Sequence, residues 1–207
     1  MLIILLVAVF GVTLILGVPI AFCLGLGGLA FIVLSGLGTK AWVNVSDYGW
    51  WAFLFRWLHV ASGVMWIGLL WYFNFVQTPS MPKIPDEQKP AVSKVIAPTA
   101  LFWFRWGAMA TIVTGLILAW MNGYLVQALS LQKGVHAIGL GMWLGTIMWF
   151  NVWFIIWPNQ KKALGIVQVS PEEKAAAAKL AGMTSRINTM LSIPMLYCMV
   201  AQQNGGL

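Results

Sequence analysis

The chain has 207 residues, of which 60% are hydrophobic and only 8% are charged. Soluble proteins carry about 25% charged residues, so this composition excludes an ordinary soluble domain, and its many aromatic residues exclude a disordered chain. The net charge of +7 fits the lysine excess of membrane proteins, because no basic run is long enough to track nucleic acid phosphates. We predict an all-α, polytopic membrane helix bundle of about five transmembrane helices.

The first apolar block has no charged residue between Leu2 and Leu37. It lacks the basic start and the cleavage site of a signal peptide, so we interpret it as a retained segment. Pro19 lies at its centre, where proline removes a backbone donor and disfavours helix in the residue before it. The block is either one long kinked span or a re-entrant hairpin, and we favour one span. Residues 1–37 are thus predicted as an N-terminal transmembrane anchor helix.

Residues 50–201 are predicted as a four-helix membrane core. Its first span covers about 50–75, and its second begins at Pro98 and ends near Asn122. Residues 77–97, between these spans, contain four prolines and five charged residues and are predicted as a solvent loop.

The last two helices of the core follow a short amphipathic stretch over residues 124–132. A span over about 133–157 is expected to stop at Pro158. Ser170, Pro171 and Glu172 then have the pattern of an N-cap, a first-turn proline and a first-turn acid. The final helix should begin there in water, enter the bilayer around 187–200, and kink at Pro194.

Lysines predict the orientation of the bundle. Seven of them lie in the loop 77–97 or after the predicted fourth span: Lys83, Lys89, Lys94, Lys161, Lys162, Lys174 and Lys179. The opposite connections hold only Lys40 and Lys133. Because lysine-rich loops stay in the cytoplasm, we predict that the C-terminus lies outside.

Two histidines carry the main functional hypothesis, because ionisable groups inside spans are costly and usually functional. His59 lies about two turns into its span and His136 lies near the start of another, so their depths agree within about 10 Å. Two such imidazoles suit the axial positions of a b-type haem, and Arg56 could meet a haem propionate. The alternative is that both histidines only form hydrogen bonds between helices. A three-ligand metal site is harder to assemble, since the spans contain no carboxylate.

Two arginines lie nearer the inner side of the predicted bundle. Arg105 lies two turns into its span and Arg186 lies at the inner end of the last one. They either snorkel to the interface or form a pocket for a polar or anionic group. Asparagines at 74, 151 and 188 could contribute to such a pocket or hold helices together.

Several ordered motifs lie between about Phe53 and Val200. They are Arg56-Trp57-Leu58-His59-Val60, Phe104-Arg105-Trp106-Gly107, His136-Ala137-Ile138-Gly139, Trp157-Pro158-Asn159-Gln160 and Ser185-Arg186-Ile187-Asn188-Thr189. With them the chain resembles the N-terminal membrane domain of the urate hydroxylase (membrane urate oxidase) family. The resemblance implies a bacterial inner-membrane domain that precedes a cytochrome c domain in longer members, and a role in oxidising urate to 5-hydroxyisourate. This sequence has no Cys-x-x-Cys-His motif for a covalent haem of its own.

We therefore predict an inner-membrane redox protein of the urate-hydroxylase type with one haem b. His59 and His136 would be its axial ligands and Arg56 its propionate partner, while Arg105 and Arg186 are the catalytic candidates. Electrons would pass to an outer-side cytochrome c or to a larger membrane redox complex.

Two alternative functions stay open. The first is a non-catalytic accessory or structural subunit of a larger membrane complex. The second is a transporter-related subunit, because residues 16–22 (LGVPIAF) resemble the start of a TRAP transporter large membrane subunit over a short apolar stretch. Neither alternative nor the favoured function involves nucleic acid.

Overall fold

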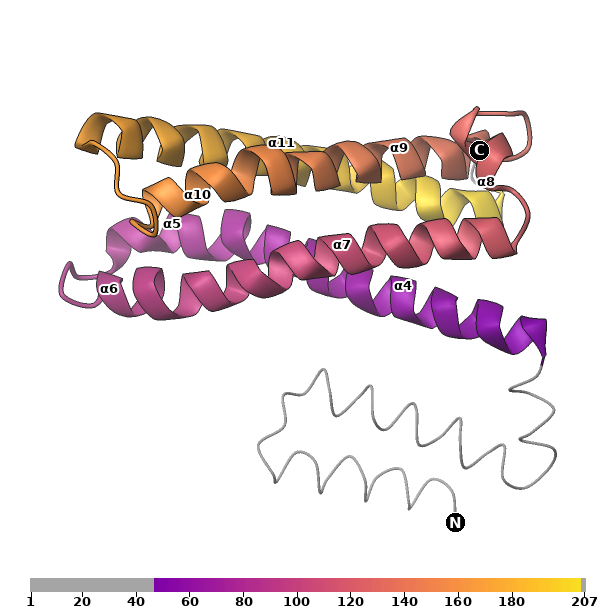
Figure 1. Cartoon of the computed structure of the whole chain (residues 1–207), viewed down its shortest axis with the longest axis horizontal. Coiled ribbons are helices and arrows are strands. Elements are labelled where there is room, and N and C mark those ends of the chain that lie inside the picture. The colour runs from indigo at the N-terminus through magenta and orange to yellow at the C-terminus, as the bar shows by residue number, and fades with distance from the viewer. Residues whose placement is uncertain (1–46, 206–207) are drawn as a thin grey trace, which may run out of the picture. The chain divides into compact units, whose positions relative to one another are not determined.

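The computed structural model describes residues 47–205, and throughout this range the secondary structure is helical, without a strand (Figure 1). The all-α prediction is therefore confirmed. The cavity and the core described below lie within one compact unit of the chain, which begins at Phe55. The predicted anchor helix over residues 1–37 and the TRAP-like stretch lie outside the described residues.

The described helices form four long rods joined by short connections (Figure 1). The first rod consists of α4 (Tyr48–Trp71), η1 (Tyr72–Gln77), α5 (Thr78–Ser80) and η2 (Met81–Lys83). The second rod consists of α6 (Lys89–Ala91), η3 (Val92–Ile96) and α7 (Ala97–Met121). The short helix α8 (Leu125–Leu129) follows. The third rod consists of α9 (His136–Phe150), η4 (Asn151–Ile156) and α10 (Trp157–Ala163), and the fourth rod is α11 (Pro171–Asn204).

Three helical stretches are long and apolar enough to cross a membrane: Tyr48–Lys83, Ala91–Met121 and His136–Ala163. They identify a membrane protein. Helix α11 has 34 residues but is not among these three stretches. The predicted count of five spans is not confirmed.

The segment 77–97 is mostly helical, and the prediction of a solvent loop over it is wrong. Helix continues to Lys83 and resumes at Lys89, so only residues 84–88 lie between the rods. Pro79, Pro82 and Pro90 each occupy one of the first two positions of a helical segment. Pro90 follows the short connection 84–88, so the backbone N–H that it lacks would have no partner within the helix.

Each of the three π-helical segments ends two residues before a proline. The N–H of Thr78 donates to the carbonyl of Phe73, and that of Trp157 donates to Val152, each five residues back. η3 ends in the same way before Pro98, with the Ala97 N–H bonded to Val92. The wider π turn gives the backbone N–H groups before the proline carbonyl partners five residues back, so the helix continues past the proline. The prediction that Pro158 stops its helix is therefore wrong, since α10 continues to Ala163.

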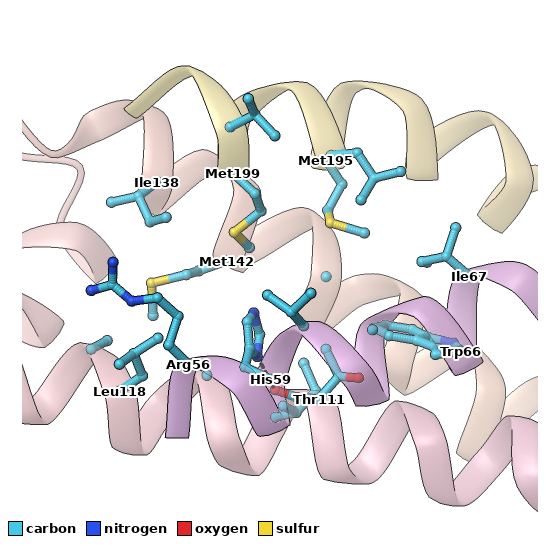
Figure 2. Close-up of a pocket in the computed structure, with 18 of the residues that line it drawn as sticks. Arg56, His59, Trp66, Ile67, Thr111, Leu118, Ile138, Met142, Met195 and Met199 are labelled. Carbon is cyan, nitrogen blue, oxygen red and sulfur yellow. Dashed lines mark hydrogen bonds between the residues drawn. The ribbon is translucent and has the colours of Figure 1, made fainter. Parts of the chain in front are cut away.

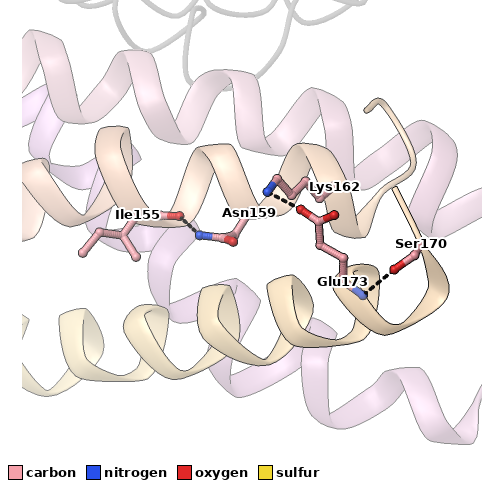
Figure 3. A network of polar contacts seen from close by, with 5 residues as sticks. All are labelled: Ile155, Asn159, Lys162, Ser170 and Glu173. Atoms are coloured by element: carbon pink, nitrogen blue, oxygen red, sulfur yellow. Dashed lines mark hydrogen bonds and ion pairs between the residues drawn. The ribbon is translucent and has the colours of Figure 1, made fainter. Parts of the chain in front are cut away.

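The start of α11 is confirmed as predicted. The Ser170 hydroxyl accepts a hydrogen bond of 3.2 Å from the backbone N–H of Glu173 (Figure 3). The Glu173 carboxylate also pairs with Lys162 at 2.6 Å and so ties α11 to α10. The pKa of Glu172 is lowered by hydrogen bonds from its own backbone N–H and from Ser170. The helix then continues past Pro194 to Asn204 as one element.

Polar side chains join α11 to the other rods. The buried Asn188 donates to the carbonyl of Met148 at 2.9 Å and accepts from the amide of Asn151 at 2.8 Å. Asn74 donates to Ser185 at 2.8 Å. The three asparagines therefore act between helices, which was one of the two roles that the sequence left open.

A continuous core lies beside these contacts. Its buried members come from all four rods: Trp66, Ile67, Leu70, Leu101, Phe104, Ala108, Met148, Val152, Ile156 and Met195. Three of these residues, Trp66, Ile67 and Met195, also line the cavity described next (Figure 2).

Candidate functional site: a cavity around His59

A cavity of about 620 Å³ lies between α4, α7, α9 and α11 (Figure 2). Most of its lining is apolar, and it includes Val60, Ile67, Leu118 and Ile138. Polar groups from Arg56, His59, Tyr124, Thr111, Thr146, Gln203 and Asn204 also reach it. A mainly apolar cavity with few polar groups is the usual form of a small-molecule or cofactor site.

The imidazole of His59 is held in one orientation. Its Nδ1 lies 2.9 Å from the backbone carbonyl oxygen of Thr111 on α7. A carbonyl can only accept, so Nδ1 carries the hydrogen and Nε2 keeps its lone pair. Nε2 has no hydrogen-bonding partner within the described residues. In Figure 2 the ring extends from α4 into the cavity.

A glycine on α7 makes room for this ring. A Cβ at Gly115 would lie 2.7 Å from Cε1 of His59 and 3.0 Å from its Nδ1. Only a residue without a side chain fits so close to the imidazole. Gly115 therefore allows His59 to lie against α7 and still reach the Thr111 carbonyl.

Three methionine side chains also line the cavity. Met142 comes from α9, and Met195 and Met199 come from α11 (Figure 2). The two on α11 are four residues apart and therefore share one face of the helix. Sequence reasoning explained the methionines by packing alone, although the spacing of this pair was a usable signal.

Arg56, three residues before His59 on α4, lines the same cavity. It has no ion-pair partner among residues 47–205. Tyr124, after the end of α7, lines the same region. Burial raises the pKa of Tyr124, and the charge of Arg56 partly opposes that shift.

His136 does not line this cavity. It is the exposed first residue of α9, while His59 projects from α4. The small residues after His136 serve helix contacts. Gly139 lies against the Ala128 carbonyl, and a Cβ at Gly141 would lie 3.2 Å from Cβ of Cys198 on α11. The structure thus brings Arg56 and His59 to one site and leaves His136 outside it.

Arg105 lies against tryptophans instead of the cavity. Its guanidinium carbon is 3.3 Å from the ring centroid of Trp157 and 6.0 Å from that of Trp153. Its Nε and Nη1 are buried and have no hydrogen-bonding partner among residues 47–205. Arg186 is exposed on α11 and does not line the cavity.

Metal-binding groups of the ordinary kind are not found in the described part of the chain, where no three His, Cys, Asp or Glu side chains come together. Cys198 is buried and free. A metal held at this cavity would therefore have to bring most of its own ligands, as a haem iron does.

Comparisons with known proteins give one finding. A family model described as "Urate oxidase N-terminal" matches residues 124–205. No curated protein and no solved structure matches the chain. The matched region covers α8 to α11 and includes Met142, Met195 and Met199 of the cavity, together with Trp157. Over residues 124–205, the chain is therefore similar to the urate oxidase N-terminal family.

Proposed function

We propose that this protein is a membrane redox protein of the urate-hydroxylase type that holds a b-type haem in the His59 cavity. The observation that supports it best is the orientation of His59. A histidine that ligates a metal commonly donates its other ring N–H to a backbone carbonyl, which fixes the tautomer and the ring. The contact between His59 and Thr111 has this form.

The residues present fit part of the predicted haem site. His59 would hold the haem iron through its Nε2, and Arg56 would hold a propionate through its guanidinium. His136 does not fit as the second ligand, because it lies outside the lining of this cavity. When bound, the haem would supply one-electron transfer.

The substrate in this proposal is urate. Its oxidation to 5-hydroxyisourate adds the oxygen of water and releases two electrons and two protons. A separate electron acceptor is therefore required, and we propose an outer-side cytochrome c or a larger membrane redox complex. The bacterial inner membrane and an outward C-terminus belong to the same proposal.

Arg105 is the candidate group for the substrate. Its Nε–H and Nη1–H, which have no partner within the described residues, would be directed donors for a planar anion, and the guanidinium is held in place against the face of Trp157. Arg105 and Thr111, which holds His59, are six residues apart on α7, or about 9 Å along the helix axis. A substrate held at Arg105 would therefore lie near the level of His59 along α7. Arg186 stays a weaker candidate on its exposed face of α11.

Purification of the full chain in detergent tests the haem proposal directly. The reduced protein should show a low-spin b-type spectrum that His59→Ala abolishes. Membranes containing the protein should consume urate only when a cytochrome or quinone acceptor is added. Arg105→Lys keeps the charge but not the planar donors, so it should lower urate turnover while the haem spectrum is unchanged.

A colourless protein of normal helical content would contradict the haem proposal. Together with the absence of urate loss under every acceptor, it would favour the non-catalytic subunit of a larger membrane complex. If Arg105→Lys lowers urate turnover only as much as it lowers the protein level, the substrate role of Arg105 is contradicted.

A further inference from the structure

We infer that the second axial ligand of the proposed haem is the thioether of Met199 on α11, in place of His136. This inference rests on the proposed function, and it names a ligand that the sequence reasoning did not consider. Met199 and His59 line the same cavity from helices that are far apart in the chain. In Figure 2 the sulfur-bearing end of Met199 extends from α11 towards the side of the cavity where His59 lies.

The side chain of Met199 is positioned by its neighbours. A Cβ at Gly141 on α9 would lie 3.2 Å from the Met199 methyl carbon, so this methyl rests against a glycine. Gly141 thus leaves room for the end of the methionine, much as Gly115 leaves room for the His59 ring. Both proposed ligands therefore reach the cavity beside a glycine of a neighbouring helix.

Other donors around the cavity are less suitable. Tyr124 would have to ligate as a phenolate, and the raised pKa of Tyr124 disfavours that form. Cys198 is buried with its Cβ against Gly141, between α9 and α11, and is not a lining residue. Met142 and Met195 do line the cavity, so the experiment compares all three thioethers.

A thioether ligand has a chemical consequence that a second imidazole would not have. Thioether in place of imidazole raises the reduction potential of the haem, because the softer sulfur favours the ferrous state. A higher potential makes the haem a better acceptor of electrons from an organic substrate. Histidine and methionine ligation therefore suits the proposed direction of electron flow, from substrate to haem to an outer acceptor.

The test uses the full-length protein with Met199→Leu, Met142→Leu and Met195→Leu made singly. Leucine nearly conserves the volume of methionine, so packing changes little. Met190→Leu is the matched control, because Met190 is on the same helix but 68% exposed. The measurements are haem content, the far-red charge-transfer band of thioether-ligated ferric haem, and the midpoint potential. Unchanged far-ultraviolet circular dichroism establishes folding of each variant.

Met199→Leu should abolish the thioether band and lower the midpoint potential, while Met190→Leu and His136→Ala leave both unchanged. Loss of the band in Met142→Leu or Met195→Leu instead would overturn the assignment to Met199. Loss of the low-spin spectrum in His136→Ala would restore the two-histidine site and overturn the inference, but not the haem proposal. A wild-type protein without haem would overturn both.

Discussion

The imidazole of His59 lies so close to Gly115 that the two residues form one unit of the site. A Cβ at position 115 would be 2.7 Å from the ring, closer than side-chain carbon atoms approach one another. The ring can donate to Thr111 only because this position has no side chain. The orientation of the functional histidine thus depends on a residue of another helix.

The first prediction concerns this pair. Gly115→Ala should push the His59 ring away from α7 and break its hydrogen bond to Thr111. We expect the free energy of unfolding to fall by about 1–3 kcal/mol, as for other overpacked sites. Bound haem should fall with it. Thermal unfolding in detergent and pigment content measure the two effects.

Gly182→Ala is the control for that prediction, since a Cβ at Gly182 meets no atom within 4 Å. It should keep wild-type pigment and equal or greater stability, because alanine favours helix more than glycine does. A Gly115→Ala protein with normal stability and normal pigment would contradict the close contact.

The second prediction concerns the asparagines between helices. Asn188→Ala removes two hydrogen bonds and leaves the Asn151 side-chain amide without its partner, while the Met148 carbonyl keeps its bond from the Asn151 backbone N–H. Asn151→Ala removes only one of them. Hydrogen bonds between membrane helices contribute about 0.6 kcal/mol on average and up to about 1.7. Unfolding titrations should therefore rank Asn188→Ala as the more destabilising variant, and the reverse order would contradict the network.

The third prediction concerns pH at the start of α11. The pKa of Glu172 is lower in the folded protein, so its stabilising contribution is present above the ordinary glutamate value of about 4.3. That contribution is lost as the pH falls through the folded pKa. Amide hydrogen exchange in the first turn of α11 should then accelerate below about pH 4.3, after correction for the intrinsic exchange rate.

Two variants separate the causes of this effect. Glu172→Gln should remove most of the pH dependence in the first turn. Ser170→Ala should weaken the turn at every pH, by about 1 kcal/mol for a lost N-cap. Equal pH dependence in the wild type and in Glu172→Gln would show that another group is responsible.

The fourth prediction concerns topology. In a background without native cysteines, Glu87→Cys lies between the first two rods, and Ser130→Cys lies after α8. Both positions are exposed. The lysine distribution predicts that a membrane-impermeant maleimide labels Ser130→Cys in intact cells and Glu87→Cys only after lysis. Labelling with the opposite pattern would invert the proposed orientation.

The sequence predicted the starts of helices well where the signal depends only on residues a few positions apart. Ser170 and Pro171 marked the start of α11, and Pro98 marked the first turn of α7. The prolines between 79 and 90 misled the prediction because a proline both breaks a helix and begins one. Which role applies depends on the backbone partners ahead of it, and these are not visible in composition.

The site was harder to predict than the fold. Arg56 and His59 were predicted together because they are one helical turn apart. The pairing of His59 with His136 rested on depth alone, and depth does not specify which faces of two helices point at each other. Thr111 and Gly115 were not predicted as part of the site. Their roles depend on contacts between helices, and the residue pattern of a single helix gives no information about such contacts.

The π-helical segments before Pro79, Pro98 and Pro158 have a consequence for comparing sequences. A π turn accommodates one residue more than an α turn, and one residue corresponds to about 100° of rotation around a helix. A helical wheel drawn straight through η4 therefore misplaces Trp157 by about 100° relative to Met142. Related chains that lack one of these prolines should also lack one residue just before it, and alignments should place single-residue gaps there.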